Sequence, residues 1–271
     1  MGTSSSSKGP KGGVSFDPPW IDTDIAKISG TPIPIASNTN TSEIILAPGN
    51  RFTDARRNFR AYIKNGRSQS LQRSIRSYVR HGLGGVSRAT SRMKFASAVG
   101  ARAFSLFKGA KDAEQLRFRE KLTALLESEH TTEDVISAIV DFILPLSGSV
   151  DEESCRNAMA EVLSDLLVDK PDIDILNLPE EDIWELLKRV IEKQIVRQIT
   201  FDIGQVLESD AINIEDKINR LDEIERFVQS VVTNSFDKVR NKNPDLSQSE
   251  VARIISEAVE LTFEVFGGED E

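Results

Sequence analysis

Residues 1–13, MGTSSSSKGPKGG, would expose a reactive amine at their start, the α-amine of Gly2. Because Gly2 is small, Met1 can be removed, and the chain then begins with an amine that no Cβ obstructs. Serine, glycine and proline bury little apolar surface, so we expect this segment to stay mobile until a partner captures it. Gly2 is therefore predicted to be a substrate of another protein and not a catalyst.

The rest of the chain offers no combination of side chains that predicts catalysis. Its two histidines, His81 and His130, are too few for most metal or acid–base sites. Cys155 lies on an apolar helical stripe, which favours a buried, inert thiol over a nucleophile. Residues 9–13, GPKGG, lack the Gly-Lys-Ser/Thr ending of a phosphate-binding loop. We therefore predict a protein that is not an enzyme and that binds neither a metal ion nor a cofactor.

The parts of the chain that would carry Gly2 differ in charge. Residues 1–50 contain 3 basic and 4 acidic side chains, residues 51–110 contain 14 and 1, and residues 111–271 contain 17 and 38. This predicts a flexible tail and strap over 1–50, a basic helical segment over 51–110 and an acidic α-helical body over 111–271. The basic segment is expected to attract the acidic body or an anionic partner.

The composition limits the class of protein. With 271 residues, 39% of them hydrophobic and 28% charged, the chain can bury a sizeable core. A single cysteine rules out an internal disulfide framework and favours a reducing compartment, so we predict a cytoplasmic protein. No run approaches the length of a membrane span, and no membrane partner is expected. Gly2 with Ser6 also fits the short, degenerate pattern for N-myristoylation, which is a weaker alternative.

Residues 14–50 show no helical period and contain five prolines, which favour extended chain: Pro18, Pro19, Pro32, Pro34 and Pro48. Helical spacing of apolar residues then predicts basic helices over 51–65 and 71–81 and a third helix over 86–107, whose small residues permit close packing. Glycines within 82–85 separate the second helix from the third, because glycine adopts positive φ at little cost.

The acidic body contains further helical stripes, and a loop over 169–178 separates two of them. Ser149 with Glu152, and Ser247 with Glu250, fit capping boxes at two helix starts. A bend is predicted near Gly204. The chain is thus predicted to be all-α, a helical bundle with a basic helical neck and an extended, largely disordered N-terminal tail.

The basic segment could bind phosphates or an acidic protein surface. Five arginines are candidates for these contacts: Arg73, Arg76, Arg80, Arg88 and Arg92. Four aromatic residues between them could stack on bases, as in proteins that bind single strands: Phe59, Tyr62, Tyr78 and Phe95. The alternative is that these arginines pair with the acidic surplus of the body.

Several short motifs occur within about the first 110 residues: Met1-Gly2-Thr3-Ser4, Gly9-Pro10, Pro18-Pro19-Trp20, the run YVRHGLGG over 78–85 and the run RATSRM over 88–93. Together they resemble motifs of the B component of the bacterial Qat anti-phage defence systems. The resemblance implies three partners, namely an ATPase (QatA), a QueC-like enzyme (QatC) and a TatD-like nuclease (QatD).

The resemblance also implies a reaction at the N-terminus. The QueC-like enzyme is expected to remove Met1 and to couple a 7-deazaguanine to Gly2 through an amide. The residues that the partner would recognise in the tail are Thr3, Ser4, Pro10 and Trp20. The helical body would dock partner proteins. A nucleic-acid-binding adaptor that uses residues 51–110 remains the alternative function.

Overall fold

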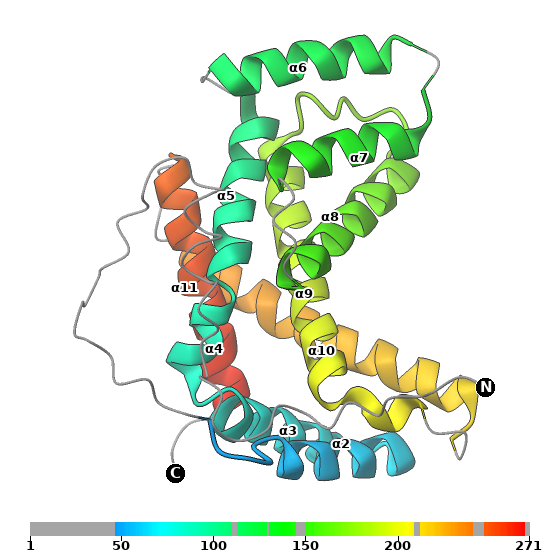
Figure 1. Cartoon of the computed structure of the whole chain (residues 1–271), viewed down its shortest axis with the longest axis vertical. Coiled ribbons are helices and arrows are strands. Elements are labelled where there is room, and N and C mark those ends of the chain that lie inside the picture. The colour runs from blue at the N-terminus through cyan, green and yellow to red at the C-terminus, as the bar shows by residue number, and fades with distance from the viewer. Residues whose placement is uncertain are drawn as a thin grey trace.

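The structure is a computed structural model that describes residues 47–109, 113–128, 130–144, 150–208, 212–240 and 247–268. Within these ranges the secondary structure is helical and contains no β-strand, so the predicted all-α class is confirmed. Figure 1 shows α2 and α3 at one end of the molecule and α6 and α7 at the other. Residues 1–46, which include most of the predicted tail and strap, lie outside the described ranges.

The basic segment begins with a helical hairpin. Helix α2 spans Thr53–Asn65 and helix α3 spans Ser68–Ser77, and the two pack against each other. Gly66 ends α2 in the left-handed conformation (φ 66°), which glycine adopts without the steric cost of a Cβ. A π-helical turn, η1 (Tyr78–Gly82), follows α3 and leads to Gly84 and Gly85, both at positive φ as predicted.

The prediction of one continuous helix over 86–107 is wrong, because two helices occupy this range. Helix α4 spans Val86–Arg92 and helix α5 spans Lys94–Gly109. Met93 (φ −92°, ψ 3°) interrupts them and is buried. No glycine or proline marks this break in the sequence. Packing decides it, because α4 lies against α11 and η1 while α5 lies against α11 and α9.

In its described residues the body contains six helices and one 3₁₀ turn: α6 (Ala113–Leu126), α7 (Thr132–Ile143), α8 (Val150–Asp169), α9 (Glu180–Ile203), η2 (Gly204–Glu208), α10 (Ile214–Arg240) and α11 (Gln248–Gly267). The predicted loop before α9 is confirmed, and α9 ends where the bend was predicted. Ser247 caps α11 with one of the two bonds of the predicted capping box, since its side chain accepts from the Glu250 amide. Ser149 lies outside the described residues.

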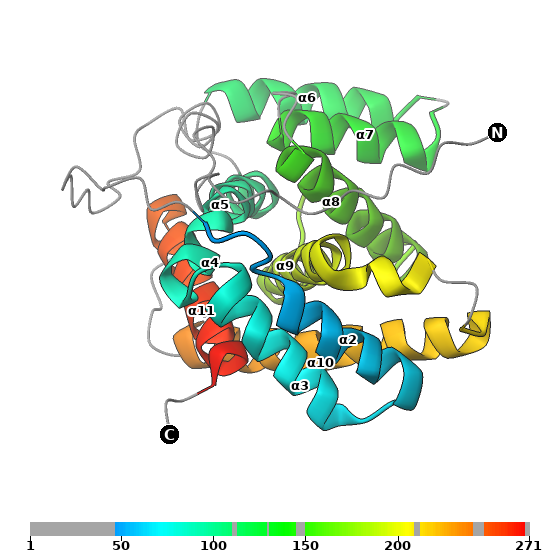
Figure 2. The same cartoon turned by 60° about the horizontal axis from the view of Figure 1, so that its bottom comes forward.

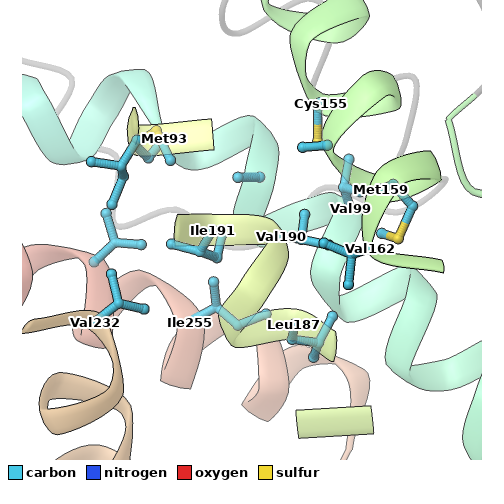
Figure 3. Packing of buried hydrophobic residues seen from close by; sticks show 14 of the residues in the cluster. Met93, Val99, Cys155, Met159, Val162, Leu187, Val190, Ile191, Val232 and Ile255 are labelled. Carbon is cyan, nitrogen blue, oxygen red and sulfur yellow. The ribbon is translucent and has the colours of Figure 1, made fainter. Parts of the chain in front are cut away.

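Helices α9 and α11 lie at the centre of the packing. Helix α11 contacts α5, α10, α4 and α3, and α9 contacts α8, α10 and α5. Gly100 on α5 allows a close approach, because a Cβ there would lie 2.5 Å from the Ile255 side chain on α11. Figure 3 shows Val99, Ile191 and Ile255 among the side chains that fill this region. One hydrophobic cluster extends from Phe52 to Phe266, so the basic segment and the acidic body share a core.

Candidate functional site

The residues predicted to form the modification site and its recognition motif lie outside the described part of the chain: Gly2, Thr3, Ser4, Pro10 and Trp20. The candidate site that the structure describes is the surface of the basic segment. The five arginines predicted there fall into two groups, one exposed and one engaged with the chain itself.

The exposed group lies on the α2–α3 hairpin, which faces the viewer in Figure 2. Helix α2 buries Ala55, Phe59, Tyr62 and Ile63 on one side. The opposite side carries basic residues at i, i+3 and i+7, and all three are exposed: Arg57, Arg60 and Lys64.

Helix α3 repeats this arrangement. It buries Leu71, Ser74 and Ile75, while Arg73 and Arg76 are exposed on the opposite side. Arg67, in the turn between the helices, is exposed as well. We call these six exposed side chains the basic face: Arg57, Arg60, Lys64, Arg67, Arg73 and Arg76. The single acid of residues 51–110, Asp54, forms an ion pair of 3.0 Å with Arg57.

Of the other three arginines, Arg80 and Arg88 bind backbone carbonyls of the chain itself, and the charge of the half-buried Arg92 acts on Arg51 and Asp202. Arg80 donates from Nε to the Gly267 carbonyl (2.7 Å) and from Nη2 to the Gly268 carbonyl (3.0 Å). A helix leaves its last carbonyls without intrahelical partners, so Arg80 caps the C-terminus of α11. Arg88 donates to the Gly84 carbonyl (3.3 Å). These side chains hold the glycine segment and α11 in place.

A polar cluster that the sequence did not predict connects the hairpin to the end of α9. The Tyr78 hydroxyl donates to the Asp202 carboxylate (2.8 Å), and Arg56 donates to the Asp202 carbonyl from Nε (3.1 Å) and Nη2 (2.8 Å). Burial raises the pKa of Asp202, against the opposing effects of Tyr78 and the nearby guanidinium groups. Burial, together with the charge of Arg92, lowers the pKa of Arg51 beside this cluster.

One feature of the sequence indicates that such a polar cluster exists. Asp202 occupies the last turn of α9, where the helix dipole disfavours an acid. An acid in that position therefore indicates that a cationic partner lies nearby. Because the partners Tyr78 and Arg56 come from more than 120 residues away, sequence spacing did not identify them.

The predicted base-stacking role of the aromatic residues is wrong. Phe59, Tyr62, Tyr78 and Phe95 are at most 5% exposed, so their ring faces contact the core and not solvent. The Tyr62 hydroxyl donates to Glu223 (2.7 Å), and burial is the main reason why its pKa is raised. The basic face therefore has no aromatic platform among these four residues.

The other candidate reactive residues do not form a site together. His81 in η1 and His130 between α6 and α7 are both exposed, and Cys155 is completely buried in α8, as predicted. Among the described residues no group of three or more histidine, cysteine or acidic side chains could hold a metal ion.

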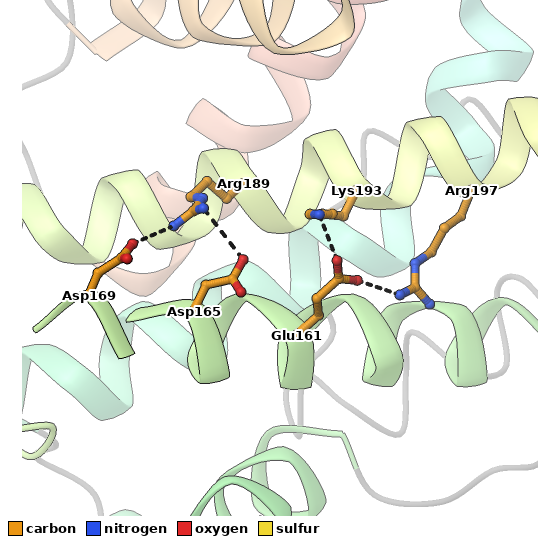
Figure 4. A network of polar contacts seen from close by, with 6 residues as sticks. All are labelled: Glu161, Asp165, Asp169, Arg189, Lys193 and Arg197. Carbon is orange, nitrogen blue, oxygen red and sulfur yellow. Dashed lines mark hydrogen bonds and ion pairs between the residues drawn. The ribbon is translucent and has the colours of Figure 1, made fainter. Parts of the chain in front are cut away.

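A contrasting set of charges joins α8 to α9 (Figure 4). Glu161 accepts from Lys193 and Arg197, each at 2.6 Å, and Arg189 lies 3.4 Å from Asp165 and 3.9 Å from Asp169. Partial burial opposes ionisation of Glu161, but its two basic partners hold its pKa below the usual range. We call these six residues the α8–α9 ion-pair ladder.

Comparison with known proteins identifies the family. No curated protein and no solved structure matches the chain. Among the described residues no helix has the length and apolarity to span a membrane. The model of one family, described as Qat anti-phage system associated protein QatB, matches residues 84–266. The match includes the RATSRM run and nearly all of the body, whereas the motifs before Gly84 precede it. The chain therefore belongs to the QatB family of proteins associated with the Qat anti-phage system.

Proposed function

We propose that this chain is a non-enzymatic subunit of a Qat defence complex, and that Gly2 accepts a 7-deazaguanine from the QueC-like component, QatC, after Met1 is removed. The proposal rests on one combination of observations. The chain belongs to the QatB family, and Met1-Gly2 is followed by a serine- and glycine-rich segment. Modification of the N-terminus is then the contribution of this chain to anti-phage defence.

The chemistry of amines favours Gly2 over the lysines nearby. An amide forms when a neutral amine nitrogen attacks an activated carboxylate carbon, the activating group leaves and the nitrogen gives up a proton. An α-amine has an ordinary pKa of about 7.7 to 8.0, whereas a lysine amine has one of about 10.4. At pH 7 the unprotonated fraction is therefore on the order of 10² larger for Gly2 than for Lys8 or Lys11.

The helical body would dock the partners QatA, QatC and QatD. Support comes from exposed apolar side chains on the body, which cost free energy in water unless a partner covers them. Val168 and Phe201 are each 77% exposed, and Ile214 is 70% exposed. They lie at the end of α8, the end of α9 and the start of α10.

Coexpression with the other Qat components tests this proposal. Intact-mass measurement should show an adduct on the wild-type chain and none when the QueC-like component is left out. Gly2→Pro offers a secondary amine and should carry no adduct, and cells should lose protection against phage. A Lys8→Arg/Lys11→Arg variant is the matched control and should keep the adduct. An adduct on Gly2→Pro, with protection retained, would contradict the proposal.

A further inference from the structure

The basic face presents positive charge that the described part of the chain does not neutralise. Apart from Arg57, none of its members forms an ion pair with another described residue. We infer that the basic face binds the phosphate backbone of double-helical nucleic acid without reading its sequence. This inference does not depend on modification of Gly2.

The spacing of the basic face places like charges next to one another. Arg57, Arg60 and Lys64 are separated by three and four residues on α2, and Arg73 and Arg76 by three on α3. Like charges at these spacings destabilise a helix, and Asp54 offsets only the first of them. An anionic partner with regularly spaced charges would remove this repulsion, and phosphate groups along a backbone supply such charges.

The side chains around the basic face favour a nucleic acid over an acidic protein. Between residues 53 and 77, all of which the structure describes, no large apolar side chain is exposed. The centre of a protein interface is usually enriched in aromatic side chains as well as arginine, and this surface exposes none of the former. Its exposed neighbours are short polar groups that suit phosphate and sugar oxygens: Asn65, Ser68, Gln69 and Gln72. Five of the six basic residues are arginines, whose planar fork binds phosphate bidentately.

The buried aromatic residues favour a duplex over a single strand. Proteins that bind single strands stack bases on aromatic rings, and Phe59, Tyr62 and Tyr78 are at most 1% exposed. The 13 residues of α2 make a helix about 20 Å long, a length over which a duplex backbone presents several phosphates.

Fluorescence anisotropy of the full-length chain with labelled DNA and RNA duplexes of about 20 base pairs, and with single-stranded DNA, tests the inference. Four phosphate contacts predict a slope of about −3.6 in log affinity against log salt, so each doubling of salt should weaken duplex binding roughly tenfold. Binding of both duplexes indicates backbone recognition alone, and binding of one indicates a preference for its helical form. Each result supports the inference.

Two charge-reversed variants locate the binding surface. Arg60→Glu/Lys64→Glu/Arg73→Glu should weaken duplex binding at least about tenfold. The control Arg117→Glu/Lys121→Glu/Lys238→Glu makes the same charge change at exposed positions of the body and should weaken it less than about threefold. Circular dichroism should show the same helicity for both.

Three results would overturn the inference. The first is that duplex binding is absent at low salt for the chain alone and for the assembled Qat complex. The second is that both variants weaken binding equally. The third is tighter binding of single strands. If duplex binding is absent and the hairpin variant loses a Qat component in a pull-down, the basic face is a protein-docking surface and the inference is wrong.

Discussion

The α8–α9 ion-pair ladder and the basic face use the same kinds of charged side chain in opposite ways. In the ladder, acids on α8 face bases on α9, and Glu161 lies within hydrogen-bond distance of Lys193 and Arg197. On the basic face, the bases lie on the side of α2 and α3 opposite their buried residues, and the guanidinium of Arg76 also lies beside Gly268 at the end of α11. The comparison shows that charge is neutralised where α8 packs on α9, whereas five of the six side chains of the basic face form no ion pair with another described residue.

The basic segment contains the same contrast on a smaller scale. Arg80 and Arg56 bind carbonyls at the C-termini of α11 and α9, while Arg73 and Arg76 remain exposed. The segment therefore joins the body through some of its arginines and presents the others to solvent. Variants of the two sets should have separable effects on stability and on binding.

The largest effect on stability is expected from Arg80, which binds backbone carbonyls at the end of α11. Arg80→Ala removes two charge-assisted hydrogen bonds from the end of α11 and should lower the free energy of unfolding by about 2 to 3 kcal/mol. The matched control, Arg73→Ala on the basic face, should change it by less than about 0.5 kcal/mol. Urea unfolding of both variants measures the difference, and equal effects would contradict the division into two sets.

Glu192 on α9 should make stability depend on pH. Burial, with a contribution from Glu225 on α10, raises its pKa to about 7. Because the folded state then binds the proton more tightly than the unfolded state, the stabilisation is complete below about pH 4.5 and is lost as pH rises through 7. Glu192→Gln keeps a neutral side chain and should gain about 2 kcal/mol relative to wild type between pH 5 and pH 8. A pH-independent difference in urea unfolding would contradict this.

A smaller effect is expected within the ladder. Glu161→Gln removes the negative partner of Lys193 and Arg197 and should cost about 1 kcal/mol, less at high salt because the pairs are partly exposed. Glu260→Gln, at an exposed position on α11, is the control and should be close to neutral. Thermal melts at low and high salt measure both, and a cost that grows with salt would count against a paired ladder.

The smallest effect has the opposite sign. Arg60→Gln or Lys64→Gln should raise the free energy of unfolding by about 0.2 to 0.5 kcal/mol, because each relieves repulsion along α2. The same variants should weaken duplex binding. Urea unfolding and fluorescence anisotropy with a labelled duplex, measured on the same preparation, would test both effects. A loss of stability would contradict the prediction, because it would show that these side chains have stabilising partners.

Helical periodicity and local signals predicted most of the fold. The positive-φ glycines of 82–85 and the Ser247 cap are encoded by adjacent residues, which explains why the sequence identified them. The break at Met93 and the Tyr78–Asp202 contact depend on helices that meet only after folding. For the same reason the sequence identified the arginine-rich segment but could not separate the arginines that bind the chain itself from those of the basic face.

The family assignment shows the same limit. The short motifs that resemble the B component of the Qat systems are local and concentrated before residue 110, whereas the family match extends over residues 84–266. The body therefore carries a family pattern that is spread over many helical positions. Such a pattern has no compact motif that inspection of the sequence would find.

The most direct test of the proposed role of Gly2 is to locate the modification within the N-terminal peptide. The chain would be purified from cells that carry the complete Qat system, and its N-terminal peptide fragmented by tandem mass spectrometry. We expect Met1 to be absent and the 7-deazaguanine to be linked to the Gly2 nitrogen. An unmodified Gly2 in chain from cells that resist phage, or an adduct on Lys8 or Lys11 instead, would contradict the account.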